Sequence, residues 1–238
     1  MKVNSHIPNL KTKTHLIFDL DGTLIDSLNI WNVIDQAVLK GLNIVVPLDI
    51  LQQEHTIFFK KENSYIHYAQ FLIKNHHLEI TPEEFLKMRW QVADSILTEQ
   101  VDFKNGVVKT LKKLKEQYVL ILATSSTKHI LSIYAHQNQK MAKRLCLETF
   151  FDMILTQEDI PFGKGKPEPD IYLTVLKKYS VKPEKCLIFE DSLEGVQAAY
   201  HSGIDVIHVN DPFIPFEDKK SIQKYTPYHL KKWSDFKI

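Results

Sequence analysis

Residues 15–27 read HLIFDLDGTLIDS, and this stretch decides the fold that we predict for the chain. Residues 16–18 form an apolar run without polar alternation, which is typical of a strand buried on both faces of a parallel sheet. Asp19 and Asp21 follow at the C-terminal end of that strand, where open α/β sheets place their active sites. The stretch therefore predicts a parallel sheet with a polar site at the end of its first strand.

The two aspartates are two residues apart, so their side chains point the same way while the chain stays extended, and Gly22 then lets the backbone turn away. Like charges this close need a cation or a shared proton, which leaves a hard divalent metal such as Mg²⁺ or an acid/base dyad. Beside Mg²⁺, one Asp can attack phosphorus while the other moves protons. A plain Asp-Gly turn is the structural alternative.

Length, charge and composition narrow the class of partner. The chain has 238 residues, 44% of them hydrophobic, which is the composition of an ordinary globular protein. Its net charge of +1 provides no electrostatic field that would attract nucleic acid or a membrane surface. It lacks a signal-peptide pattern and any run of about 20 apolar residues. Cys146 and Cys186 are too few for a disulfide framework or a zinc site. We expect a cytoplasmic monomer or small homo-oligomer with a small-molecule partner.

The pattern between the first strand and about residue 100 is helical, with no convincing strand. The helices that we predict there run from Ser27 to Leu39 with Asp26 as the cap, from Pro47 to His55, from Lys60 to Asn75, and from a capped start at Thr81-Pro82-Glu83-Glu84. This segment predicts an all-helical insertion.

Strand and helix patterns alternate over the rest of the chain. We predict strands at 118–123, 153–155, 186–189 and 206–209, and helices at 107–117, 170–179 and 192–202. Such alternation is typical of a parallel sheet with helices on both faces. The predicted fold is α/β, a doubly wound parallel sheet formed by residues 1–27 and 101–238, with residues 28–100 as the helical domain. We expect the tail from Asp211 to pack over the core, with a binding arm as the alternative.

Polar residues follow several of these strands at one edge of the sheet, or precede a helix there. The four sets are Asp19 with Asp21, Thr124 with Ser125, Lys166, and Glu190 with Asp191. Together they suit phosphoryl transfer, which needs in-line positioning and neutralisation of charge. Thr124 can donate its hydroxyl to a phosphoryl oxygen, or cap the helix that follows. Lys166 can act as a point cation, with Lys164 as a competitor.

The second acidic pair, Glu190 and Asp191, follows a buried strand and faces the first pair across the sheet edge. Two acidic clusters without compensating charge are unfavourable, and Mg²⁺ removes the conflict. An Asp-Ser helix cap is the structural alternative, although it does not explain the Glu.

Four stretches, FDLDGTLIDS, LATSS, GKPEPDIY and IFEDSLEGVQAAYHSG, resemble the haloacid dehalogenase superfamily, most of all its phosphatase and β-phosphoglucomutase-like branch. The resemblance implies a Rossmann-like core, a helical cap after the first motif, Mg²⁺, Asp19 as nucleophile and Asp21 as general acid/base. The residues expected to bind substrate phosphate are Thr124, Ser125 and Lys166, and those expected at the metal are Asp19, Asp21, Glu190 and Asp191.

Two positions narrow the subclass. Dehalogenases proper lack the second Asp of the first motif, so Asp21 favours a phosphate ester; β-phosphoglucomutases carry a His where Trp31 stands. We predict a Mg²⁺-dependent phosphatase of a small phosphorylated metabolite, acting through an aspartyl-phosphate. The alternatives are a sugar phosphomutase or phosphotransferase and a non-catalytic phospho-acceptor module. Five residues of the predicted cap could reach a polar leaving group, but we expect each of them on a solvated helix face and assign none to the site: Lys60, Lys61, His67, Tyr68 and Arg89.

Overall fold

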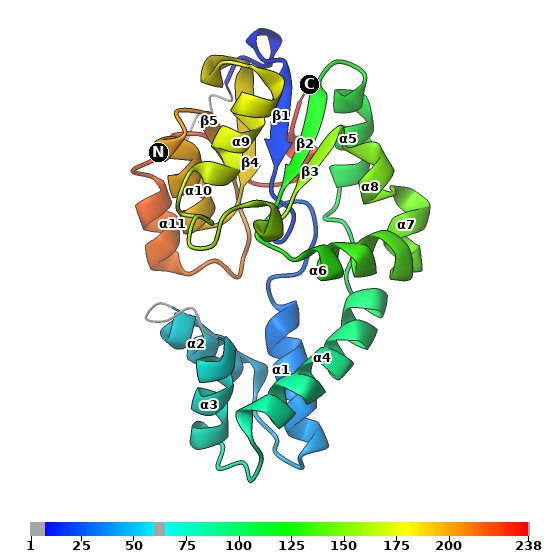
Figure 1. Cartoon of the computed structure of the whole chain (residues 1–238), viewed down its shortest axis with the longest axis vertical. Helices are drawn as coiled ribbons and strands as arrows, with labels where there is room; N and C mark the ends of the chain where they lie inside the picture. The colour runs from blue at the N-terminus through cyan, green and yellow to red at the C-terminus, as the bar shows by residue number, and fades with distance from the viewer. Residues whose placement is uncertain (1–7, 60–64, 238) are drawn as a thin grey trace. The chain divides into compact units, whose positions relative to one another are not determined.

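The computed structural model describes residues 8–59 and 65–237 and divides into two compact units (Figure 1). One consists of Met1–Asp26 with Asp102–Ile238 and is called the α/β unit below; the other, Ser27–Val101, is called the helical unit. In the part of the chain described, no helix is long and apolar enough to cross a membrane.

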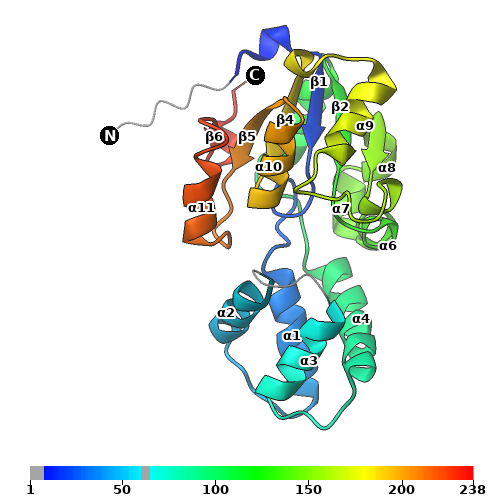
Figure 2. The same cartoon turned by 60° about the vertical axis from the view of Figure 1, so that its left-hand side comes forward.

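The α/β unit is built on a six-stranded parallel sheet in the order β3-β2-β1-β4-β5-β6. Its strands are β1 (His15–Phe18), β2 (Val119–Ala123), β3 (Met153–Leu155), β4 (Cys186–Glu190), β5 (Asp205–Val209) and β6 (His229–Leu230). The predicted doubly wound parallel sheet is confirmed, and β1 lies at its centre. The sequence did not predict β6, a two-residue strand of the tail that extends one edge of the sheet beside β5 (Figure 2).

Helices and the C-terminal tail cover the two faces of this sheet. The helices of the unit are α5 (Val107–Lys115), α6 (Lys128–Ser132), α7 (Gln139–Arg144), α8 (Leu147–Phe150), α9 (Asp170–Tyr179), α10 (Leu193–His201) and α11 (Phe216–Ile222). Residues of α9 and α10 share one hydrophobic cluster with Ile17 and Ile188. The next residue of β4, Phe189, points to the opposite face and packs 5.2 Å from the ring of Trp233. The tail therefore packs over the core, as predicted.

The helical unit contains α1 (Ile30–Gly41), α2 (Leu48–Phe59), α3 (Tyr65–Asn75) and α4 (Pro82–Glu99). The predicted capped start of α4 is confirmed, because Thr81 and Glu84 form a reciprocal capping box. The predicted cap of α1 is wrong. The helix begins at Ile30 after Asn29, whereas the backbone N–H of Asp26 donates to the Asp102 carbonyl at 3.0 Å. The first five residues of the helix predicted from Lys60 lie outside the described residues.

A buried ion pair holds two helices of this unit together. Nε of Arg89 in α4 lies 2.6 Å from Oδ1 of Asp35 in α1, and the two side chains are 3% and 0% exposed. Tyr68 donates its hydroxyl to Asp35 at 3.1 Å, and the guanidinium of Arg89 lies 4.6 Å from the ring centroid of Trp31. Burial and the Asp35 charge raise the pKa of Tyr68. Tyr68 and Arg89 are therefore buried residues that hold the helical unit together, and the expectation that they lie on a solvated helix face is wrong. Lys60 and Lys61 lie outside the described residues.

We predict that Asp35→Asn destabilises the helical unit by about 3–5 kcal/mol, because it leaves the Arg89 charge buried without its partner. Urea unfolding followed by hydrogen exchange of amides in α1 and α4 measures the loss. Glu79→Gln, at an exposed position of the same unit, is the control and should change the free energy of unfolding by less than about 0.5 kcal/mol. Equal stability of the two variants would contradict the prediction.

Candidate active site

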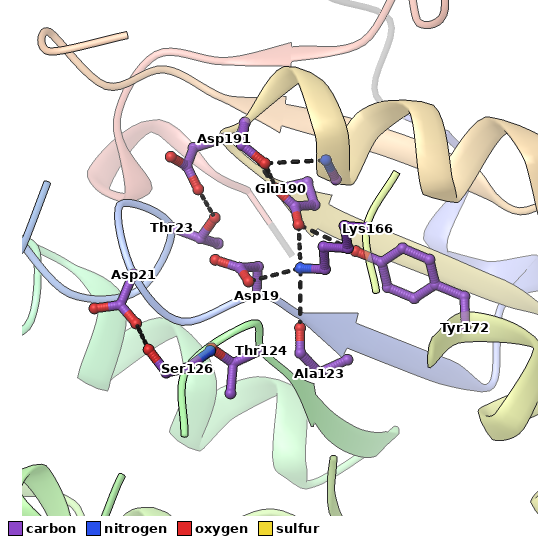
Figure 3. A network of polar contacts seen from close by, with 12 residues as sticks. Asp19, Asp21, Thr23, Ala123, Thr124, Ser126, Lys166, Tyr172, Glu190 and Asp191 are labelled. Carbon is purple, nitrogen blue, oxygen red and sulfur yellow. Dashed lines mark hydrogen bonds and ion pairs between the residues drawn. The ribbon is translucent and has the colours of Figure 1, made fainter. Parts of the chain in front are cut away.

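Three carboxylates meet where β1 and β4 end. Phe18 pairs with Phe189 in the sheet register, so Asp19 and Glu190, the next residue of each strand, lie side by side. One carboxylate oxygen each from Asp19, Glu190 and Asp191 lies within 4.8 Å of the other two, and all three residues are buried (Figure 3). The structure thus brings together three of the four predicted metal ligands.

Lys166 supplies a positive charge between two of these carboxylates. Its Nζ donates to Oδ1 of Asp19 at 2.7 Å, to the Ala123 carbonyl at 3.2 Å, and to Oε1 of Glu190. The side chain is 4% exposed. Burial acts to lower the pKa of Lys166, but the charges of Asp19 and Glu190 hold it well above its ordinary value. The residue therefore stays an ammonium at neutral pH, as its predicted role requires.

Glu190 is held by protein groups on both carboxylate oxygens. Oε1 also accepts the Tyr172 hydroxyl at 3.1 Å, and Oε2 accepts the backbone N–H and the hydroxyl of Ser192, both at 3.1 Å. Gly195 lies directly behind the carboxylate, since a Cβ there would stand 1.9 Å from Oε1. Glu190 therefore has a fixed position in which it orients Lys166.

Asp191 has one partnered and one free oxygen. Oδ1 accepts the Thr23 hydroxyl at 2.7 Å, whereas Oδ2 is buried and has no hydrogen-bond partner among the described residues. Burial and the neighbouring Glu190 raise the pKa of Asp191 well above its ordinary value. Burial also raises the pKa of Asp19 to about 8, against the opposing effect of Lys166. Hard oxygen donors, an excess of negative charge and an orphaned buried oxygen fit a divalent cation such as Mg²⁺.

The Asp21 carboxylate lies outside this group of three. It accepts the Ser126 hydroxyl at 2.5 Å and the Tyr134 hydroxyl at 3.2 Å, because the chain turns at Gly22, where φ is 78°. Figure 3 shows Asp21 directed at Ser126 rather than at Lys166. Ser126 belongs to the predicted LATSS motif, but nothing in the sequence pointed to Tyr134.

The segment after β2 shows that Thr124 is not the cap of the next helix, which was the structural alternative for this residue. Thr124 is buried and its Oγ1 accepts the Ser126 backbone N–H at 3.0 Å, while α6 begins later and is capped by Thr127. A helix cap at Thr124 is therefore wrong, because the chain makes a further turn before the helix. Ser125 is exposed at this turn.

Known proteins are similar to this chain in sequence and in fold. Residues 16–209 match the family model described as haloacid dehalogenase-like hydrolase. The chain belongs to this family. A Drosophila melanogaster relative of this haloacid dehalogenase-like hydrolase, named a probable pseudouridine-5′-phosphatase, is 29% identical over 206 residues, which cover 85% of this chain and 84% of the relative. The phosphorylated carbohydrates phosphatase of Thermotoga maritima is 28% identical over 194 residues, covering 81% and 83% of the two chains.

A solved structure extends the similarity to nearly the whole fold. CbbY from Rhodobacter sphaeroides, crystallised with phosphate, superposes with a TM-score of 0.69 at 16% identity, covering 94% of this chain and 96% of CbbY. At that identity the similarity concerns the fold alone. The family and the phosphatase relatives make this protein a phosphoric monoester hydrolase.

The absence of a side chain at Gly195 leaves room for the Glu190 carboxylate, so a substitution there tests whether the position of Glu190 matters. Alanine normally favours a helix over glycine by about 0.5–1 kcal/mol. We predict instead that Gly195→Ala in α10 destabilises the protein by about 1–3 kcal/mol and lowers turnover, because the new Cβ displaces the Glu190 carboxylate. Thermal unfolding and phosphate release measure the two effects.

Gly41→Ala is the matched control, since a Cβ at this helical position would meet nothing within 4 Å. It should leave turnover unchanged and keep or raise stability by up to about 1 kcal/mol. A Gly195→Ala protein as active and as stable as the Gly41→Ala protein would contradict the fixed position of Glu190.

Proposed function

We propose that this protein is a Mg²⁺-dependent phosphatase that hydrolyses a small phosphorylated metabolite through an aspartyl-phosphate on Asp19. The observation that carries the proposal is the contact of Lys166 with Asp19 beside a buried carboxylate, Asp191, one oxygen of which has no partner within residues 8–59 and 65–237. A phosphate ester brings negative charge to this point, and the ammonium together with a cation would neutralise it.

Asp19 is the nucleophile in this proposal. Lys166 binds its Oδ1, so we assign the attack on phosphorus to Oδ2, with the P–O bond to the leaving group breaking in line. Asp21 gives its proton to the leaving oxygen and takes one from the water that later hydrolyses the aspartyl-phosphate. The hydroxyls of Ser126 and Tyr134 hold the Asp21 carboxylate in one orientation during both transfers.

The remaining predicted residues are assigned to the metal ion or to the substrate phosphate. Asp19 and Asp191 are the ligands that we favour for Mg²⁺, since both oxygens of Glu190 already have protein partners. When bound, the ion supplies positive charge for the phosphoryl oxygens. Lys166 and Thr124, with Ser125, are assigned to the substrate phosphate. We further propose that the helical unit serves as the cap that excludes bulk water and selects the leaving group.

The relatives suggest the substrate class. Their names specify pseudouridine 5′-phosphate and phosphorylated carbohydrates, so we propose a phosphate monoester of a sugar or a nucleoside. A sugar phosphomutase is less well supported, because Trp31 packs under Arg89 and against Trp90 at the position where mutases carry a His. A cytoplasmic location and a monomer or small homo-oligomer stay predictions.

We predict Mg²⁺-dependent phosphate release from at least one of pseudouridine 5′-phosphate, hexose phosphates, phosphoglycolate and an aryl phosphate. A chelator should abolish release and added Mg²⁺ should restore it, because buried carboxylates need the ion to accept an anionic substrate. Product analysis with a hexose phosphate separates hydrolysis from transfer to a second hydroxyl. Isomerised sugar phosphate without free phosphate would replace the phosphatase with the mutase.

We predict that Asp19→Asn abolishes turnover without unfolding the chain, since the amide cannot form the aspartyl-phosphate. Asp21→Asn should lower turnover by about 10²- to 10⁴-fold, the range for loss of a general acid/base. Initial rates with thermal unfolding of each variant measure both effects. Asp49→Asn, at an exposed position, is the control. Substantial turnover by Asp19→Asn would contradict the assignment of the nucleophile.

A further inference from the structure

Trp233 in the C-terminal tail contacts the loop that carries the first motif. Its side chain is buried, and its indole N–H donates to the Thr23 carbonyl at 2.8 Å, across 210 positions of sequence. The ring packs 5.2 Å from that of Phe189 and 6.1 Å from that of Phe18. A buried indole N–H among aromatic rings needs an acceptor, so this bond fixes the Thr23 carbonyl against the sheet.

Thr23 connects this fixed carbonyl to Asp191 through its side chain. The residue is fully buried, and its hydroxyl donates to Oδ1 of Asp191 at 2.7 Å. With Oδ1 held, the direction of the unpartnered Oδ2 of Asp191 is fixed as well. A shift of the Thr23 backbone would therefore turn the carboxylate that we assign to the metal.

A second support lies one residue earlier in the same loop. The ammonium of Lys104 donates to the Gly22 carbonyl and, at 2.5 Å, to the buried carboxylate of Asp211. The carbonyls of Gly22 and Thr23 thus each receive a side-chain donor from a distant segment. The tail also packs against the backbone two residues after Lys104. A Cβ at Gly106, where φ is 92°, would stand 2.8 Å from the backbone nitrogen of Ser234.

We propose that Trp233 is a positioning residue of the active site, which acts through Thr23 to orient Asp191 toward a bound divalent cation. The inference rests on the proposed function in taking Asp191 as a metal ligand. It assigns to the tail a role in metal affinity, in addition to its packing over the sheet.

The test is the Mg²⁺ affinity of the full chain carrying Trp233→Phe, which keeps a ring and removes the donor. Calorimetric titration with Mg²⁺ and the Mg²⁺-dependent shift of thermal unfolding give the affinity without an activity assay. Partners of metal ligands contribute about 10- to 100-fold to affinity; Thr23→Val should approach the lower value, and Trp233→Phe, one contact further away, should weaken binding by about 3- to 10-fold. Turnover at saturating Mg²⁺ should fall less than affinity.

The double variant tests the route of the effect. If Trp233 acts through Thr23, Trp233→Phe should add little to Thr23→Val, so the two losses of affinity should not multiply. Phe236→Leu is the matched control: its ring packs 5.9 Å from that of Trp233, and the variant should be less stable with unchanged Mg²⁺ affinity. Trp233→Tyr, which also lacks the indole N–H, serves if Trp233→Phe does not fold.

The outcomes separate this inference from the proposed function. A wild-type chain that binds no Mg²⁺ would overturn the proposed function together with the inference. Wild-type binding that Trp233→Phe leaves unchanged would overturn the inference alone, as would equal losses of affinity in Trp233→Phe and Phe236→Leu.

Discussion

The α/β unit depends on how three buried carboxylates are held beside one ammonium group. Burying a charge costs several kcal/mol unless partners surround it, and Lys166 alone leaves Asp19, Glu190 and Asp191 with excess negative charge. The structure meets this cost with hydroxyl and backbone donors from several segments, including Tyr172 for Glu190 and Thr23 for Asp191. In the part of the chain that the structure describes, one oxygen of Asp191 is left without a partner, and that oxygen fits a divalent cation.

The topology of the sheet determines where these carboxylates meet. In the order β3-β2-β1-β4-β5-β6, the chain winds outward in one direction from β1 and in the other from β4, so the ends of β1 and β4 form the switch point of the sheet. Parallel register places Asp19 next to Glu190 there without any special loop. The helix α10 passes directly behind the Glu190 carboxylate, where Gly195 is the small residue that leaves room for it.

Local patterns were sufficient to predict most of the fold and the charged residues of the site. Apolar runs gave the strands that carry Asp19 and Glu190, and the capping box gave the start of α4. What failed depends on contacts between residues far apart in sequence. Asp26 resembles a helix cap locally, but its backbone N–H donates to the Asp102 carbonyl. Arg89 was expected on a solvated helix face, whereas the structure buries it against Asp35 of another helix.

The hydrogen bonds that position the site residues could not be predicted either, because they too join residues far apart in sequence. Thr23 and Asp191 are 168 positions apart, and Trp233 lies 210 positions from Thr23, so no window of sequence contains either pair. The composition of the tail, which is rich in Pro, Lys and aromatic residues, predicted a segment packed over the core, and this describes Trp233 correctly. It could not predict that the one polar atom of that side chain would face the loop that follows β1.

The same loop also begins the connection to the helical unit, which explains why it needs support from outside. Ile25 pairs with Phe103, and the backbone N–H of Lys104 donates to the Leu24 carbonyl at 2.9 Å, so the outgoing and returning strands of the connection are bonded to each other. Arg144 anchors the returning strand at Asp102. Any displacement of this connection would reach Gly22 and Thr23 within two residues, unless those carbonyls were fixed from the sheet side. Trp233, and Asp211 through the side chain of Lys104, supply that fixation, so the loop that carries Asp19 and Asp21 is held to the α/β unit next to the connection between two separately packed units.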